Sequence, residues 1–138
     1  MKQKKKAIIL LAVVALLFLF LVSPYVLQII FTGSPVKDSV KIKNYDSETH
    51  SVSIEMFDLN DKLVFKENYT LKPNESVSKE KSFFEKYTLK TKKYNMKVVL
   101  DDKIIERNPV YMGWTDNAIV DIYWKQDIPI RINTVTYN

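Results

Sequence analysis

The pattern of hydrophobic and polar residues changes once along this chain. Sixteen apolar residues run without a break from Ala7 to Val22, and a second apolar run extends from Tyr25 to Phe31. From Ser39 onward, apolar and polar residues alternate with a period of two. A continuous apolar run predicts a helix in nonpolar surroundings, whereas alternation predicts half-buried strands. The sequence therefore predicts one apolar helix followed by a β domain.

Residues 7–31 have the length of a single membrane-spanning helix. Twenty-five residues at about 1.5 Å each give roughly 37 Å of helix, and the hydrocarbon core of a bilayer is about 30 Å thick. Four lysines precede the run and no acidic residue occurs before Asp38: Lys2, Lys4, Lys5 and Lys6. By the positive-inside rule, residues 1–6 form a cytoplasmic tail and the chain after the helix is exported. Residues 32–38, with Gly33 and Pro35, are expected to form a short linker.

Two other interpretations of residues 7–31 stay open. A cleaved secretory signal would release the domain, although no A-x-A cleavage motif follows the apolar run and Pro35 lies beside the small residues Thr32 and Ser34. A buried helix of a soluble domain is disfavoured because the segment has no polar face. Pro24 is compatible with a spanning helix and predicts a kink in it. Alternatively, the spanning helix ends near Pro24, and Tyr25 to Phe31 lie in the outer interface.

Six segments after the helix alternate as half-buried strands do. Their apolar positions are Val40 and Ile42; Val52, Ile54 and Met56; Leu63, Phe65, Tyr69 and Leu71; Tyr94, Met96, Val98 and Leu100; Ala118, Val120, Ile122 and Trp124; and Ile128, Ile130 and Ile132. Glu67 interrupts the third of these faces. Polar turn residues separate the segments: Asn60-Asp61-Lys62, Lys72-Pro73-Asn74-Glu75, Asp101-Asp102-Lys103 and Asn108-Pro109, the last of which is expected to end a strand.

The spacing of strands and turns predicts an all-β fold for residues 39–138. Strands that recur with short turns are typical of an antiparallel, Ig-like β-sandwich, here of about 7–9 strands. Residues 79–93 are ambiguous, because Val77, Tyr87 and Leu89 fit strands while Phe83, Phe84 and Tyr87 also fit one face of a short helix. We predict a strand, a crossover and a second strand there.

Charge and cysteine content exclude several classes of function. Four of the 21 lysine and arginine residues precede the apolar run, which leaves 17 against 16 acidic residues in the exported part. Nucleic-acid binding requires a clustered basic face, so no nucleic-acid partner is expected. The chain has no cysteine and only two glycines. Disulfides, zinc–thiolate sites, thiol catalysis and glycine-rich phosphate loops are therefore excluded.

Few residues suggest a modification site, a catalytic site or a binding site. Asn68-Tyr69-Thr70 and Asn74-Glu75-Ser76 match the N-glycosylation pattern, so Asn68 and Asn74 are candidate glycan acceptors in or beside a turn. His50 is the only histidine and is expected to lie in a solvated loop. No combination of residues indicates a catalytic, cofactor-binding or metal-binding site, and we expect no cofactor.

The segment Val110–Trp114 is unusual because it places large apolar groups beside Gly113 in a predicted loop. Tyr111, Met112 and Trp114 either close the end of the sandwich or form an exposed patch that contacts a partner, a glycan or the bilayer surface. We expect Trp114 to be in the core and Tyr111 to be partly exposed.

Three further stretches carry a family resemblance: Lys43–Ile54, Lys62–Phe65 and Leu71–Glu75. Together with the lysine-rich anchor, they resemble small archaeal membrane-anchored ectodomain proteins with an Ig-like or fibronectin-like sandwich. Those proteins share an N-x-D turn before an H-x-V-x-V strand, a VF strand and an L-x-P-G-E turn, in which Asn74 replaces the glycine here. The resemblance covers about residues 40–100 and implies a fold and a location more than an activity.

The sequence thus predicts a non-enzymatic, single-pass membrane protein whose exported sandwich binds another envelope component. The bilayer is the partner of residues 7–31, and an envelope protein or a surface glycan is the partner of the domain. Two alternatives remain: a cleaved, secreted form, or an accessory or stator-like subunit of an archaeal envelope complex. The outline of anchor plus sandwich is similar to the stator proteins of the archaeal rotary filament, in architecture alone.

Overall fold

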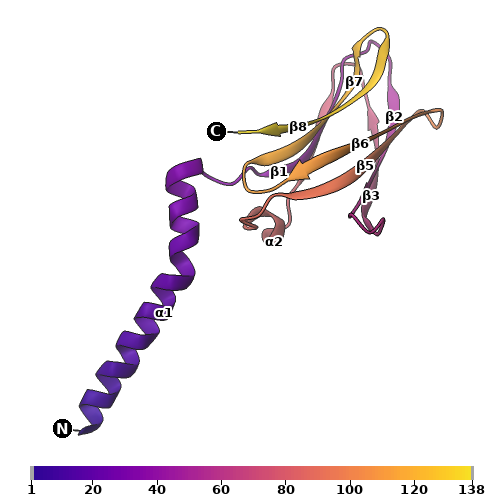
Figure 1. The fold of residues 1–138 in the computed structure, drawn as a ribbon. Coiled ribbons are helices and arrows are strands. Elements are labelled where there is room, and N and C mark those ends of the chain that lie inside the picture. Colours follow the sequence, from indigo (N-terminus) through magenta and orange to yellow (C-terminus); the bar gives the residue numbers. More distant parts are fainter. Residues whose placement is uncertain (1, 138) are drawn as a thin grey trace. The chain divides into compact units, whose positions relative to one another are not determined.

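A computed structural model describes residues 2–137 and divides the chain into two compact units, which meet at Gly33 and Ser34. The first unit is the helix α1 (Lys2–Thr32), and the second is a mostly β domain (Figure 1). The helix begins earlier than predicted and includes the lysine-rich tail. Lysine is a good helix former, so the helix propagates through these residues. The side chain of Lys2 lies outside the described residues.

The helix continues through Pro24. Proline has no N–H, so the carbonyl of Phe20, four residues earlier, loses its usual donor. The hydroxyl of Ser23 donates to this carbonyl at 3.3 Å, and the hydroxyl of Thr32 donates to the carbonyl of Gln28 at 2.8 Å. Residues Lys4–Thr32 are long and apolar enough to cross a membrane, and none of this helix is buried in the described structure.

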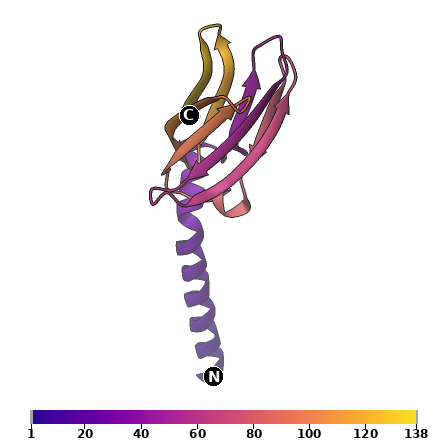
Figure 2. The same ribbon diagram turned by 90° about the vertical axis from the view of Figure 1, so that its right-hand side faces the viewer.

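Two four-stranded sheets form the second unit (Figures 1 and 2). The strands are β1 (Asp38–Asn44), β2 (His50–Phe57), β3 (Leu63–Leu71), β4 (Ser76–Glu80), β5 (Lys92–Leu100), β6 (Ile104–Met112), β7 (Asp116–Lys125) and β8 (Ile128–Thr136). One sheet has the order β4-β1-β7-β8 and the other has the order β3-β2-β5-β6. All pairs are antiparallel except β1 with β7, which run parallel. The expectation of a purely antiparallel sandwich is therefore wrong at this one pair.

The strands define two ends of the domain. The end at which the chain enters β1, here called the proximal end, carries residues 34–37, the β2–β3 turn, the short helix α2 (Phe83–Lys86) and residues 113–115. The opposite, distal end carries residues 45–49, 72–75, 101–103 and 126–127. In Figures 1 and 2, α2 and the β2–β3 turn lie at the same end of the sandwich.

One apolar layer between the sheets forms the core. The predicted inward positions of the alternating segments supply most of it: Val40, Ile42, Val52, Ile54, Met56, Leu71, Met96, Val98, Leu100, Ala118, Val120, Ile122, Ile130 and Ile132 are all buried. Their alternation with polar residues keeps one face of each strand in contact with water. The prediction of a sandwich with these core positions is confirmed.

The alternation fails at Leu63 and at Trp124, which were predicted to face inward but are 49% and 41% exposed. The pairing of β7 with β8 shifts after Ile122, and Tyr123 has a φ of 49°. A bulge adds one residue to the strand, so every side chain beyond it changes face. Tyr123 packs against the core instead, and Trp124 lies over the guanidinium of Arg131 on the outside.

The structure also corrects one predicted boundary. β6 continues through Pro109 to Met112, because β6 is an edge strand and its outward-facing backbone needs no ladder donor there. The strand, crossover and second strand predicted for residues 79–93 are confirmed: the segment contains the end of β4, a crossover with the helix α2, and the start of β5. The helix forms because Ser82 and Glu85 make a capping box.

The core predicts how two isoleucines will differ on truncation. In a fragment of residues 34–138, which we expect to fold cooperatively, Ile54→Ala should lower the free energy of unfolding by about 2–5 kcal/mol, because Ile54 is 1% exposed between the sheets. Ile105→Ala is the control, since Ile105 is 56% exposed and should change stability by less than about 0.5 kcal/mol. Denaturant unfolding followed by circular dichroism measures both, and similar losses for the two variants would contradict the assigned faces.

Candidate functional site

His50 lies between two carboxylates at the distal end. Its Nδ1 is 2.7 Å from Oδ2 of Asp101, its Nε2 is 2.8 Å from Oδ2 of Asp46, and the residue is only 5% exposed. Only the protonated ring donates from both nitrogens. Burial lowers the pKa of His50, but the hydrogen bonds and charges of Asp101 and Asp46 outweigh burial and raise this pKa above its ordinary value. The expectation of a solvated loop histidine is wrong, because two turns far apart in sequence meet over the ring.

The contacts with His50 also lower the pKa values of the two carboxyl groups. The hydrogen bond from His50 lowers the pKa of Asp46. Burial acts to raise the pKa of Asp101, but hydrogen bonds from His50 and from the backbone N–H of Ser51 lower it on balance. Both ring nitrogens of the charged His50 are bonded to carboxylates, so neither nitrogen is available to bind a metal ion. This cluster, here called the His50 clamp, is therefore a structural link between the β1–β2 and β5–β6 turns.

A buried lysine occupies the proximal end. Lys81 is 7% exposed, and its Nζ donates to the carbonyls of Gly113 at 2.6 Å and Asp116 at 2.8 Å. Burial lowers its pKa, and the nearby charge of Asp116 only partly offsets this effect. Asp116 in turn accepts from the hydroxyls of Thr91 at 2.8 Å and Thr136 at 2.7 Å. These contacts join three chain segments and leave the ammonium enclosed.

The aromatic segment at the end of β6 is split between the core and the surface. Met112 is 8% exposed and Trp114 is 2% exposed, whereas Tyr111 is 45% exposed. The ring of Trp114 lies 6.2 Å from the ring of Tyr87. Gly113 is required here because a Cβ atom would come within 2.9 Å of the backbone of Thr91. Of the three predicted contact residues, only Tyr111 is accessible to a partner, on the outer face of its sheet.

The outer face of the β3-β2-β5-β6 sheet is polar and partly paired. Glu55 on β2 lies between Lys66 of β3 at 2.7 Å and Lys97 of β5 at 2.8 Å. The hydrogen bonds from Lys66 and then Lys97 lower the pKa of Glu55 to about 2. One carboxylate thus faces two ammonium groups, and this part of the face keeps a positive charge.

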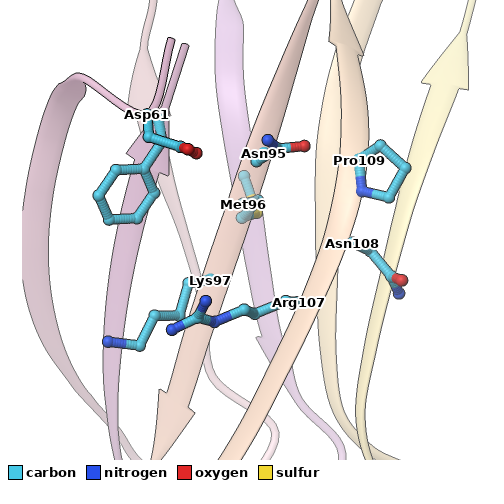
Figure 3. A pocket seen from close by; sticks show the side chains of 8 residues that line it. Asp61, Asn95, Met96, Lys97, Arg107, Asn108 and Pro109 are labelled. Atoms are coloured by element: carbon cyan, nitrogen blue, oxygen red, sulfur yellow. The ribbon is translucent and has the colours of Figure 1, made fainter. Parts of the chain in front are cut away.

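An open pocket of about 420 Å³ lies beside these pairs (Figure 3). It is lined by Phe57, Asp61, Asn95, Met96, Lys97, Arg107, Asn108 and Pro109. Figure 3 shows the Lys97 and Arg107 side chains reaching the same region from neighbouring strands, with Asp61 contributed by the β2–β3 turn. Among the described residues, Arg107 makes no ion pair and the amide of Asn95 makes no hydrogen bond. These groups are free to meet a ligand.

The candidate glycan acceptors lie in different surroundings. Asn68 is exposed on β3 opposite Ser53, so it lies within a strand and not in a turn. Asn74 is exposed in the turn between β3 and β4 with a φ of 58°, a conformation that asparagine tolerates better than most residues. Both side chains are accessible from solvent. Within residues 2–137, no cluster of three or more metal-ligating side chains occurs.

Sequence reasoning missed Arg107 and Asp61 as candidate binding residues. They are 46 positions apart in the sequence, and each looks like an ordinary exposed residue of a strand or a turn. Their proximity depends on the order of strands in the sheet. The hydrophobic pattern of a single sequence does not reveal that order.

The His50 clamp predicts a pH-dependent stability. The stabilisation by His50 is complete below its unfolded pKa of about 6.5 and is lost as the pH rises through the higher folded value. The stabilisation by Asp46 and Asp101 is lost as the pH falls below about 4 and through their lowered folded values. The melting temperature should therefore be highest between about pH 4 and 6.5. His50→Gln should remove the decline above about pH 6.5, because no other histidine is present; an unchanged slope would contradict the clamp.

Comparison with known proteins assigns no role to these residues. No protein-family model, no curated protein and no solved structure matches the chain. The interpretation of the pocket and of the two end clusters therefore depends on their geometry.

Proposed function

We propose that this protein is a non-enzymatic, membrane-anchored binding protein of the cell surface, whose sandwich binds another component of the envelope. The observation that carries the proposal is the division of the chain into an apolar helix with no buried residue in its spanning segment and a separately packed β unit. Exposed apolar side chains along a helix are stable in lipid and not in water. The lysines at its N-terminal end favour a cytoplasmic N-terminus.

The pocket on the outer face is the proposed binding surface. Its residues supply an unpaired guanidinium, amide groups and a carboxylate beside the apolar surfaces of Phe57 and Pro109. A guanidinium binds carboxylates through two parallel hydrogen bonds, amides bind hydroxyl groups, and flat apolar surfaces pack against sugar rings. This chemistry fits an acidic surface glycan better than a neutral apolar ligand. Tyr111 lies on the same face, two positions beyond Pro109 on β6.

The family proposal remains one of architecture and location. An archaeal, Ig-like membrane-anchored ectodomain is compatible with two packed sheets behind an apolar helix. In an immunoglobulin constant-type domain, however, the second and third strands lie in opposite sheets, whereas β2 and β3 pair within one sheet here. We therefore extend the resemblance to the layers and not to the strand order.

The first test concerns topology. Protease added to intact cells should digest the β unit and leave the lysine-rich end protected. Replacing Lys4, Lys5 and Lys6 with glutamine should weaken or invert this orientation, because positive charges next to the helix hold that end in the cytoplasm. A β unit that resists protease until the cells are lysed would contradict export.

The second test concerns the pocket. Arg107→Ala should weaken binding of the domain to isolated cell envelopes about 10–100-fold, since a hydrogen bond to a charged group contributes about 1.5–3 kcal/mol. Lys41→Ala removes the same charge from the outer face of the other sheet and should have little effect. Enzymatic removal of envelope glycans should abolish the difference between the two variants. Equal binding by Arg107→Ala and the unaltered domain would contradict the assigned surface.

A further inference from the structure

Exposed apolar side chains gather at one end of the β unit. Among the described residues after α1, ten large apolar side chains are exposed, and seven of them lie in the proximal end or in the strand ends and residues next to it: Leu59, Leu63, Val64, Phe83, Phe84, Tyr87 and Tyr137. Single exposed apolar residues are ordinary on protein surfaces, but a gathered set marks an interaction site. The distal end has only Ile105 and Trp124 near it.

The helix α2 presents the largest of these side chains. Phe83 is 72% exposed and Phe84 is 85% exposed, although the helix is held in place by the capping box of Ser82 and Glu85. Phe83 makes an edge-on contact with Phe84 and a tilted contact with Tyr87, with ring centroids 5.9 and 4.9 Å apart. The capping box fixes the backbone of α2 while both rings are exposed to solvent. The helix therefore holds the two rings outside the core.

Lysines flank these rings in the sequence. Residues 81–93 contain five lysines and one acidic residue, Glu85. Lys81 is buried, but Lys86, Lys90, Lys92 and Lys93 form no ion pair among the described residues. Aromatic or aliphatic tips flanked by lysines are the composition of segments that lie in a membrane interface. The lysines complement anionic lipid headgroups, and their attraction falls off within about a Debye length.

The chain that connects α1 to the proximal end is short. Lys37 lies five positions after Thr32, the last residue of α1, which limits the distance between their Cα atoms to about 18 Å. The carbonyl of Lys37 accepts from the N–H of Lys81 at 2.9 Å, and α2 begins two residues later. This limit holds for any orientation of the helix.

We propose that the proximal end, through Phe83, Phe84 and Leu59, inserts into the surface of the same bilayer that α1 spans. This inference depends on the proposed membrane anchoring and adds a second lipid contact to it. Two lipid contacts restrict the tilt of the domain. The pocket on the outer face of the β3-β2-β5-β6 sheet then keeps a fixed direction relative to the membrane.

The absence of cysteine makes depth measurement direct. Single cysteines replace Leu59, Phe84, Leu17 in α1 and Gln126 at the distal end in the full chain, reconstituted in phosphatidylcholine vesicles with and without phosphatidylglycerol. Nitroxide labels then report collision with oxygen, which concentrates in lipid, and with a water-soluble nickel complex. We expect Leu59→Cys and Phe84→Cys to show an oxygen-to-nickel ratio close to that of Leu17→Cys and several-fold above that of Gln126→Cys. Phosphatidylglycerol should raise it further.

The outcomes separate the two proposals. If the label at Leu17 is reached by nickel, the membrane anchoring itself is wrong. If Leu17 is in lipid while Leu59 and Phe84 behave like Gln126, only the insertion is wrong. If neither reagent reaches Leu59 and Phe84, a protein surface such as a second copy covers them, and the insertion is again wrong.

A pair of variants tests whether α2 and the β2–β3 turn insert into the bilayer together. Phe83→Ser combined with Phe84→Ser should lower the oxygen-to-nickel ratio at Leu59→Cys toward the value at Gln126→Cys. Ile105→Ser removes an exposed apolar side chain near the distal end and should leave the ratio at Leu59→Cys unchanged. A lipid-like ratio at Leu59→Cys in the double serine variant would overturn the role given to α2.

Discussion

Burial of one face of each sheet is the constraint on which the β unit depends. Each strand alternates apolar and polar side chains, so neither sheet is stable alone in water, and stacking the two apolar faces satisfies both. The side chains of Ile54 and Val98 from one sheet and Val120 from the other are each no more than 1% exposed. No disulfide supplements this layer, because the chain has no cysteine.

Polar clusters close the two open ends of that layer. At the distal end the His50 clamp joins two turns, and at the proximal end Lys81 binds carbonyls of the β6–β7 connection. A buried charge is costly unless its hydrogen bonds are made. Both clusters make them, and so each fixes the position of turns that apolar packing alone would leave free. Their buried ionisable groups therefore have structural roles.

Two surfaces that belong neither to the core nor to the two polar clusters carry the proposed functions. The outer face of one sheet offers Arg107 beside Phe57 and Pro109, and the proximal end offers Phe83 and Phe84 beside lysines. The first surface suits a polar, acidic ligand and the second suits a lipid interface. Because both belong to one compact unit, contact at the second surface would set the direction in which the first one faces.

The sequence by itself determined the apolar helix, the β class and the inward positions of most strands, because hydrophobic periodicity is a local property of the chain. Ile54 and Val98 are examples of positions that local alternation assigns correctly. The bulge at Tyr123, which turns Trp124 outward, has no such local signal. Asp101 reaches His50 across 51 positions, and Arg107 joins Phe57 in one pocket. Only the tertiary structure decided these contacts, because they depend on which strands are neighbours, and strand order follows from the packing of the whole domain.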